Sequence, residues 1–198
     1  MERKSTASML TTTDAIVLSL QPHSDKAHLL HAYTRAGGRV NYMVYGLGRK
    51  NAAGMYMPLS LIQITATNDP TKPPTIKEVC QRSGLSGEAG LYKQTIRLFI
   101  AEILHHVLRH PMPDEPMFDF IEQSVRELDS QEDVQNFHVQ FLIDFAGKLG
   151  FAMEKEPAMP TNRKERQETL RALCNYFEEH VDTWQNPRSM DVLMEVFD

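Results

Sequence analysis

Residues 14–50 read DAIVLSLQPHSDKAHLLHAYTRAGGRVNYMVYGLGRK and carry the clearest structural pattern in this 198-residue chain. The stretch opens with an apolar run at residues 15–18, which predicts a buried strand. After a glycine pair at residues 37–38, strand-forming side chains alternate between two faces. One face holds Val40, Tyr42 and Val44. We therefore expect β-structure here, with Tyr42 directed into the core and Tyr45 on the opposite face.

Another run, at residues 25–35, precedes the glycine pair, and two further strand-like runs follow, at residues 59–64 and 76–80. The connection at residues 68–74 is rich in Asn, Asp and Pro, which favours a loop. Five short strands in one segment are typical of a closed barrel, in which few strand edges stay exposed. We expect an OB-type (oligonucleotide/oligosaccharide-binding) barrel. An SH3-like barrel has the same strand count, so periodicity leaves both open.

The glycine-rich stretch at residues 84–90 marks a change from strand to helix periodicity. Beyond it, apolar residues recur every three or four positions, which predicts amphipathic helices. The expected helices cover residues 92–108, 114–128, 134–149, 163–184 and 189–197, with helix-end residues at Asp114, Gly150, Asn162 with Glu165, and Ser189. We therefore predict an α+β chain, with a five-stranded OB-type barrel in residues 1–83 and an all-α domain in residues 91–198.

Charge is divided unevenly along the chain. Residues 1–82 hold ten Lys/Arg against five Asp/Glu, a balance of +5, whereas residues 83–198 hold eleven against twenty-one, a balance of −10. Because phosphate recognition depends on local cationic density, the first segment is compatible with nucleic-acid binding despite the net charge of −5.

The barrel segment interleaves cations with tyrosines. Single-stranded nucleic acid is held by aromatic faces that stack on bases and by cations that follow the backbone. Five residues in this pattern are the predicted nucleic-acid-binding site: Arg35, Arg39, Tyr45, Arg49 and Lys50. Tyr33, Tyr42 and Tyr56 complete the aromatic set, and strand alternation assigns at least some of them to the core.

The inventory of reactive groups does not favour an enzyme. Two distant cysteines, Cys80 and Cys174, form neither a disulfide framework nor a cysteine zinc site, so we expect reduced thiols. Glu102, His106 and His110 are spaced four apart and would share one helix face, which raises a metal-site hypothesis. A matching motif on a second helix is absent from the sequence, so the preferred interpretation is structural and no metal is expected.

Other catalytic patterns are also missing from the sequence. The chain has no P-loop motif, no dinucleotide-binding glycine fingerprint and no nucleophile elbow near Ser24 and Asp25. We expect no catalytic residues and no cofactor. No apolar run approaches the roughly 20 residues that span a bilayer, so we expect a cytoplasmic protein with no membrane partner.

The order of these segments resembles the RecO family of bacterial recombination mediators. The resemblance runs from AIVL at residues 15–18 through GRV at residues 38–40 to the glycine and basic turn ending at Lys50. It continues in the helical half, through residues 92–104, 116–121 and 136–151. Two departures stand out. The region from Phe151 to Pro160 has no cysteine where many relatives carry a four-cysteine zinc site, and the basic turn holds only two cations.

The resemblance implies a DNA repair and homologous recombination mediator that is not an enzyme. It implies binding to single-stranded DNA, or duplex DNA, annealing of complementary strands, and loading of the recombinase. It also implies partnership with RecR and with the acidic C-terminal tail of the single-strand-binding protein, in the cytoplasm at the nucleoid. The alternative is a protein-interaction adaptor whose degenerate OB barrel has little affinity for DNA, which the acidic second half favours. A metal-dependent hydrolase is a remote third reading.

Overall fold

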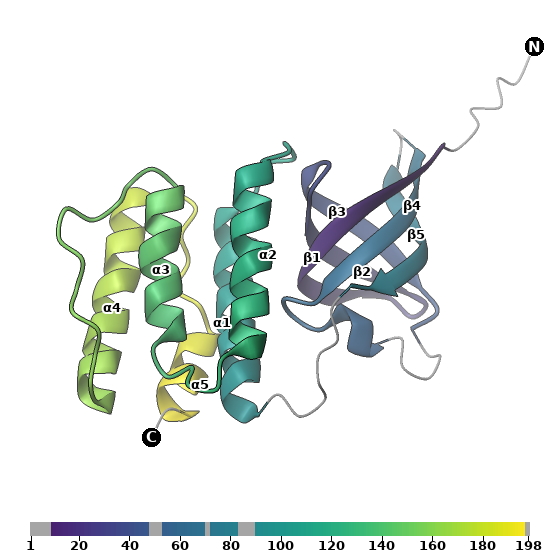
Figure 1. The fold of residues 1–198 in the computed structure, drawn as a ribbon. Coiled ribbons are helices and arrows are strands. Elements are labelled where there is room, and N and C mark those ends of the chain that lie inside the picture. Colours follow the sequence, from purple (N-terminus) through teal and green to yellow (C-terminus); the bar gives the residue numbers. More distant parts are fainter. Residues whose placement is uncertain (1–8, 48–52, 70–71, 83–89, 197–198) are drawn as a thin grey trace, which may run out of the picture. The chain divides into compact units, whose positions relative to one another are not determined.

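The computed structural model describes residues 9–47, 53–69, 72–82 and 90–196 (Figure 1). These residues form two compact units. One unit holds the described residues up to 82 together with His110–Glu115, and the other holds residues 90–109 and 116–196. The predicted boundary stretch at residues 84–90 lies outside the described residues except for Gly90.

Five strands close into a barrel in the order β1-β2-β3-β5-β4 (Figure 1). Their bounds are β1 Met9–Ser24, β2 Ala27–Thr34, β3 Gly38–Tyr45, β4 Leu61–Asp69 and β5 Lys72–Gln81, and the short 3₁₀ helix η1 Ala53–Tyr56 precedes β4. Neighbouring strands are antiparallel except β3 and β5, which run parallel at the pair Met43–Thr75. This crossover connectivity is that of an OB barrel, so the predicted fold is confirmed and the SH3-like alternative is excluded.

Alternate side chains of each strand fill the barrel. The core cluster comprises Ala15, Val17, Leu30, Ala32, Tyr42, Val44, Tyr56, Ile62, Ile64 and Ala66. Tyr42 is 5% exposed and Val44 3% exposed, whereas Tyr45 is 58% exposed. The predicted assignment of Tyr42 to the core and of Tyr45 to the opposite face is confirmed.

The strands extend further than their sequence pattern indicated. Residues 68–74 were expected to be a loop, but β4 reaches Asp69 and β5 begins at Lys72, with these two residues paired. Pro73 and Pro74 are the second and third residues of β5, near the start of the strand, where a missing amide donor costs little. Antiparallel pairing between the two strands therefore overrides the loop-like composition.

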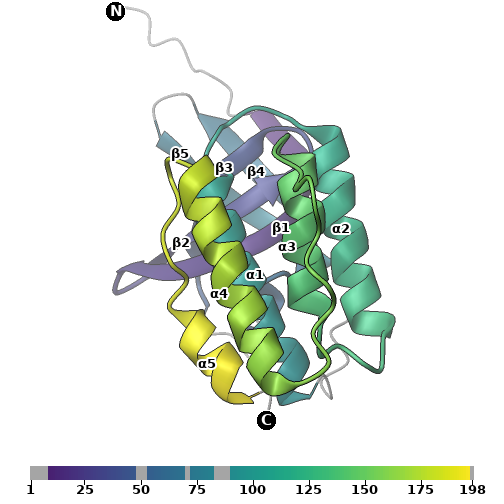
Figure 2. The ribbon, with the colours of Figure 1, turned by 90° about the vertical axis from the view of Figure 1, so that its left-hand side faces the viewer.

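Five helices form the second unit (Figures 1 and 2). They are α1 Leu91–Val107, α2 Glu115–Ser130, α3 Phe137–Lys148, α4 Arg163–His180 and α5 Ser189–Val196. α1 packs against α3 and α5, and α3 packs against α4. The apolar periodicity of each helix supplies the buried face, and the predicted all-α architecture is confirmed.

Some predicted helix-end residues have the predicted role, whereas others differ in their contacts or position. Gly150 has φ +92°, as expected of a C′ residue after α3. Asn162 accepts a hydrogen bond from Glu165 N at 3.0 Å, and the Glu165 carboxylate accepts from Thr161 N and Thr161 Oγ1 at 2.8 Å each. The third helix begins at Phe137, three residues after the expected Val134.

The segment His110–Glu115, which links α1 to α2, packs on the β2–β3 turn of the barrel. Arg39 N donates to His110 O at 3.1 Å. Gly38 has φ +60°, and a Cβ built there would lie 2.1 Å from Met112 O and 2.8 Å from His110 O. Glycine is therefore required here both for the backbone conformation and for the close approach of the linking segment.

Candidate nucleic-acid interface

The outer face of the β2–β3 hairpin is the surface that OB barrels commonly present to nucleic acid. Strand register sets the outward cross-strand pairs as Ala27–Tyr45, Leu29–Met43, His31–Asn41 and Tyr33–Arg39. Tyr45 is the exposed aromatic residue of this row, at 58%, whereas Met43 is 9% and Tyr33 3% exposed. Tyr45 therefore presents the ring best placed to stack on a base.

Two exposed lysines accompany Tyr45 at its end of the hairpin. Lys26 lies in the β1–β2 turn, next to Ala27, which pairs with Tyr45. Met43 on β3 pairs with Thr75 on the parallel strand β5. Tyr45 lies two residues after Met43, and Lys77 lies two residues after Thr75. A register shift at Lys77 interrupts the alternation of β5, but Tyr45 and Lys77 are both exposed and so both lie on the outer side of the barrel. Across the described ranges neither lysine forms an ion pair. Sequence reasoning missed both, because only strand register places them near Tyr45.

The middle of the hairpin face is polar and uncharged near neutral pH. His31 Nδ1 lies 2.6 Å from Asn41 Oδ1. Burial lowers the pKa of His31, the Asn41 hydrogen bond opposes this, and the positive charge of Arg39 lowers the pKa further. The net pKa is below the usual 6.5, so His31 adds no cation to the surface at neutral pH.

Arg35 and Arg39 lie at the other end of the hairpin from Tyr45. They flank the β2–β3 turn, where Thr34 pairs with Gly38. Arg35 Nη1 lies 3.4 Å from Glu115 Oε1, and its side chain is 30% exposed. Six positions of β3 separate Arg39 from Tyr45, about 20 Å of strand. The structure therefore does not bring these two arginines together with Tyr45.

Arg49 and Lys50, the remaining predicted site residues, lie outside the described residues. In the sequence they follow Tyr45 by four and five positions. Their contribution to the site stays a prediction.

The other tyrosines of the pattern are not available for stacking. Tyr33, Tyr42 and Tyr56 are 3%, 5% and 6% exposed. Burial raises the pKa of Tyr33 to about 12, with Asp114 adding to the effect, and burial raises the pKa of Tyr42 to about 12. Both phenols stay protonated and serve the packing of the barrel unit.

Glu102, His106 and His110 do not share one helix face, although their spacing in the sequence raised the hypothesis of a metal site. α1 ends at Val107, so His110 is not on the helix with Glu102 and His106. The Glu102 carboxylate instead accepts hydrogen bonds from Arg188 N, Ser189 N and Ser189 Oγ at 2.9, 3.0 and 2.7 Å. Within the described residues, no group of three or more His, Cys, Asp or Glu side chains is arranged to hold a metal ion.

Glu102 has a structural role that the sequence did not indicate. Burial by itself would raise its pKa, but the Ser189 and Arg188 hydrogen bonds, with the charge of His106, bring the net pKa below the usual 4.5. The carboxylate thus stays ionised and caps α5. Ser189 was expected to cap this helix with its own side chain, but its hydroxyl donates to Glu102 instead.

None of the helices in the described part of the chain combines the length and apolar character that a bilayer crossing requires.

Comparison with known proteins agrees with this architecture. The family model described as "Recombination protein O N terminal" matches residues 9–79, and "Recombination protein O C terminal" matches residues 90–156. Three relatives, each named "DNA repair protein RecO", illustrate the similarity. Those from Flavobacterium johnsoniae and Flavobacterium psychrophilum are 25% and 27% identical over 236 and 237 residues, covering 96% of this chain and 100% of each relative.

The relative from Phocaeicola vulgatus is 31% identical over 150 residues, which cover 72% of this chain and 61% of the relative. The two family models lie on either side of the change from barrel to helices, so each unit of the structure is matched over part or most of its length. The chain therefore belongs to the RecO family of DNA repair proteins.

Proposed function

We propose that this RecO-family chain binds single-stranded DNA without sequence readout, through the Tyr45 end of the β2–β3 hairpin. The observation that carries the proposal is the 58% exposure of Tyr45 on the outer face of a closed OB barrel. The exposed Lys26 adjoins Ala27, the cross-strand partner of Tyr45, and the exposed Lys77 lies on the neighbouring strand β5. In this arrangement Tyr45 stacks on a base, while the lysines, with Arg49 and Lys50, neutralise backbone phosphates. Arg35 and Arg39 form a secondary cationic position at the far turn.

We expect this binding to support a role as a recombination mediator in the cytoplasm. Neutralising phosphates lowers the repulsion between two strands, so complementary strands can approach and anneal with no chemical step and no cofactor. Family membership supports the further proposal that the chain works with RecR and with the acidic tail of the single-strand-binding protein. Duplex DNA would compete for the same cations, but it offers no unstacked base to Tyr45.

A substitution pair tests the proposed site. Tyr45→Ala should weaken binding of a labelled single-stranded oligonucleotide, by about 1–3 kcal/mol for one lost stacking contact. Tyr92→Ala is the matched control, since Tyr92 is 45% exposed on the helical unit and should leave affinity unchanged. If both variants bind as tightly as the parent chain, the Tyr45 end is not the interface.

The protein-interaction adaptor remains the second candidate, because one specific contact favours it. Arg35 pairs with Glu115 at 3.4 Å, so one of the predicted DNA-binding cations already has an acidic partner within the chain. An adaptor would show no measurable DNA affinity at low salt and would still bind RecR. The two candidates are thus separated by one DNA titration.

A further inference from the structure

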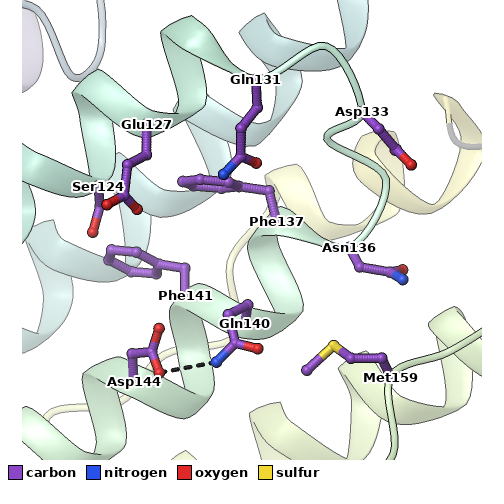
Figure 3. Close-up of a pocket in the computed structure, with 10 residues that line it drawn as sticks. All are labelled: Ser124, Glu127, Gln131, Asp133, Asn136, Phe137, Gln140, Phe141, Asp144 and Met159. Atoms are coloured by element: carbon purple, nitrogen blue, oxygen red, sulfur yellow. Dashed lines mark hydrogen bonds between the residues drawn. The ribbon is translucent and has the colours of Figure 1, made fainter.

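A trough runs along the seam between α2 and α3 in the helical unit. It comprises two adjoining pockets of about 290 and 480 Å³, which share Ser124, Glu127 and Asp144 as lining residues. Figure 3 shows the first pocket, with Glu127 and Ser124 on the α2 side, Asp144 and Gln140 on the α3 side, and the Phe137 and Phe141 rings between them. The trough therefore has an aromatic floor and polar walls.

The walls carry negative charge that the chain itself does not neutralise. Glu127 Oε1 accepts from Gln123 Nε2 at 2.8 Å, and Asp144 Oδ1 accepts from Gln140 Nε2 at 2.9 Å. Both donors are neutral amides. In the described part of the chain, neither carboxylate forms an ion pair with a Lys, Arg or His side chain. Each carboxylate is thus held in place by an amide while keeping its charge for an outside partner.

Lys148, a cation that lines the second pocket of the trough, contacts an aromatic ring. Lys148 Nζ lies over the Phe120 ring, 5.7 Å from its centroid. A cation–π contact of this kind holds the ammonium at the wall, and within the described residues Lys148 forms no ion pair with Glu127 or Asp144. Met159, 39% exposed at the opposite end of the trough, adds an accessible apolar side chain.

We propose that the α2–α3 trough binds an extended basic segment of a partner protein. Its apolar side chains would pack on Phe137, Phe141 and Met159, and its Lys or Arg side chains would pair with Glu127 and Asp144. The α3 helix rises about 16 Å over its twelve residues, which matches about five residues of extended peptide. Because the walls are acidic, charge complementarity favours a partner segment with positive charge.

This partner differs in charge from two of those implied by the family resemblance. Single-stranded DNA and the acidic tail of the single-strand-binding protein are both anionic, so the carboxylates of the trough repel them. The trough is therefore a separate surface, and its occupation does not depend on whether the barrel binds DNA.

Fluorescence anisotropy with three labelled peptides tests the proposal on the full chain. The probes are Lys-Leu-Lys-Leu-Lys, the same peptide with Glu for Lys, and the same peptide with Ser for Leu. The lysine–leucine peptide should bind at least tenfold more tightly than the glutamate peptide and at least threefold more tightly than the serine peptide. Comparable affinity for the first two would overturn the proposal.

Variants then locate the binding. Glu127→Gln with Asp144→Asn keeps both side-chain shapes, removes both charges, and should weaken the lysine–leucine peptide at least tenfold. The control is Glu178→Gln with Glu179→Gln, which removes two exposed charges from α4 and should leave affinity within twofold. Circular dichroism melting of all variants checks that the fold is kept. An unchanged affinity in the first variant, or an equal loss in the control, would show that binding is not in the trough.

Discussion

The carboxylate of Glu102, on α1, caps the start of α5: its Oε2 accepts hydrogen bonds from Ser189 Oγ at 2.7 Å and from Ser189 N at 3.0 Å. Arg188 N completes the set by donating to Oε1 at 2.9 Å. An anionic acceptor at a helix N-terminus satisfies amide groups that have no intrahelical partner. The contact therefore fixes the last helix of the chain to the first.

Glu102→Gln should destabilise the helical unit by about 1–3 kcal/mol, because a charged acceptor of three hydrogen bonds is replaced by a neutral amide. Urea denaturation followed by circular dichroism measures the loss. Glu178→Gln, an exposed α4 control, should stay within about 0.5 kcal/mol of the parent. Equal stability of the two variants would contradict the capping role.

The same contact predicts a pH dependence. The pKa of Glu102 is lowered on folding, so its contribution is complete above its usual pKa of 4.5 and is lost as pH falls through the folded value. The stability difference between the parent chain and Glu102→Gln should therefore be largest near pH 7 and should shrink below about pH 4. Denaturation curves at pH 7, 5 and 3.5 check this, and a difference that grows towards acid would oppose it.

Gly38→Ala should destabilise the barrel unit more than Gly46→Ala. Both glycines have positive φ, +60° and +75°, so each alanine carries a similar backbone cost of about 1–2 kcal/mol. Only the Gly38 Cβ meets the linking segment, at 2.1 Å from Met112 O, whereas nothing lies within 4 Å at Gly46. The extra cost should be about 1–3 kcal/mol by thermal denaturation. Equal effects would mean that His110–Glu115 does not hold the turn.

The chain should need no bound metal for folding. Glu102 is engaged with Ser189, and His110 lies beyond the end of α1. Elemental analysis of purified protein should find less than stoichiometric zinc and iron, and a chelator should leave the melting temperature unchanged. Stoichiometric metal that disappears in His106→Ala would contradict this prediction.

The barrel interior was predictable from sequence, whereas the contacts of its charged residues were not. Tyr42 and Val44 are buried and Val40 is partly buried, as strand alternation predicts from residue spacing. Glu102 and Ser189, by contrast, lie 87 positions apart, and Arg35 and Glu115 lie 80 apart. Local pattern contains no information on such pairings, so neither the contact of Glu102 with Ser189 nor the ion pair of Arg35 with Glu115 was predictable from the sequence.

The neighbours of Tyr45 were predictable only in part, for the same reason. Tyr45 follows from alternation within one strand, but the positions of Lys26 and Lys77 follow from register between strands. The length of β4 and β5 through residues 68–74 also depends on pairing, which overrides the loop propensity of Asn, Asp and Pro. Composition therefore suggested the type of the proposed site, whereas which residues lie near one another depends on tertiary pairing.

Arg49→Ala with Lys50→Ala should weaken single-stranded DNA binding without unfolding the barrel. Each lost phosphate contact should reduce the magnitude of the slope of log affinity against log salt by about 0.7. Stability should change by only about 0.5 kcal/mol. Val44→Asp is the folding control, because Val44 is 3% exposed in the barrel core and a buried charge there should unfold it. Unchanged affinity and slope in the double variant would remove this turn from the interface.

The central claim is that the barrel binds single-stranded DNA mainly through the phosphate backbone of the DNA. It is tested most directly by fluorescence anisotropy of a labelled homopolymer strand across a salt series. Contacts from Lys26, Lys77, Arg49 and Lys50 predict a log–log slope of about −2 to −3, with similar affinity for strands of different base composition. Binding that is undetectable at low salt, or a slope near zero, would contradict the account and favour the adaptor.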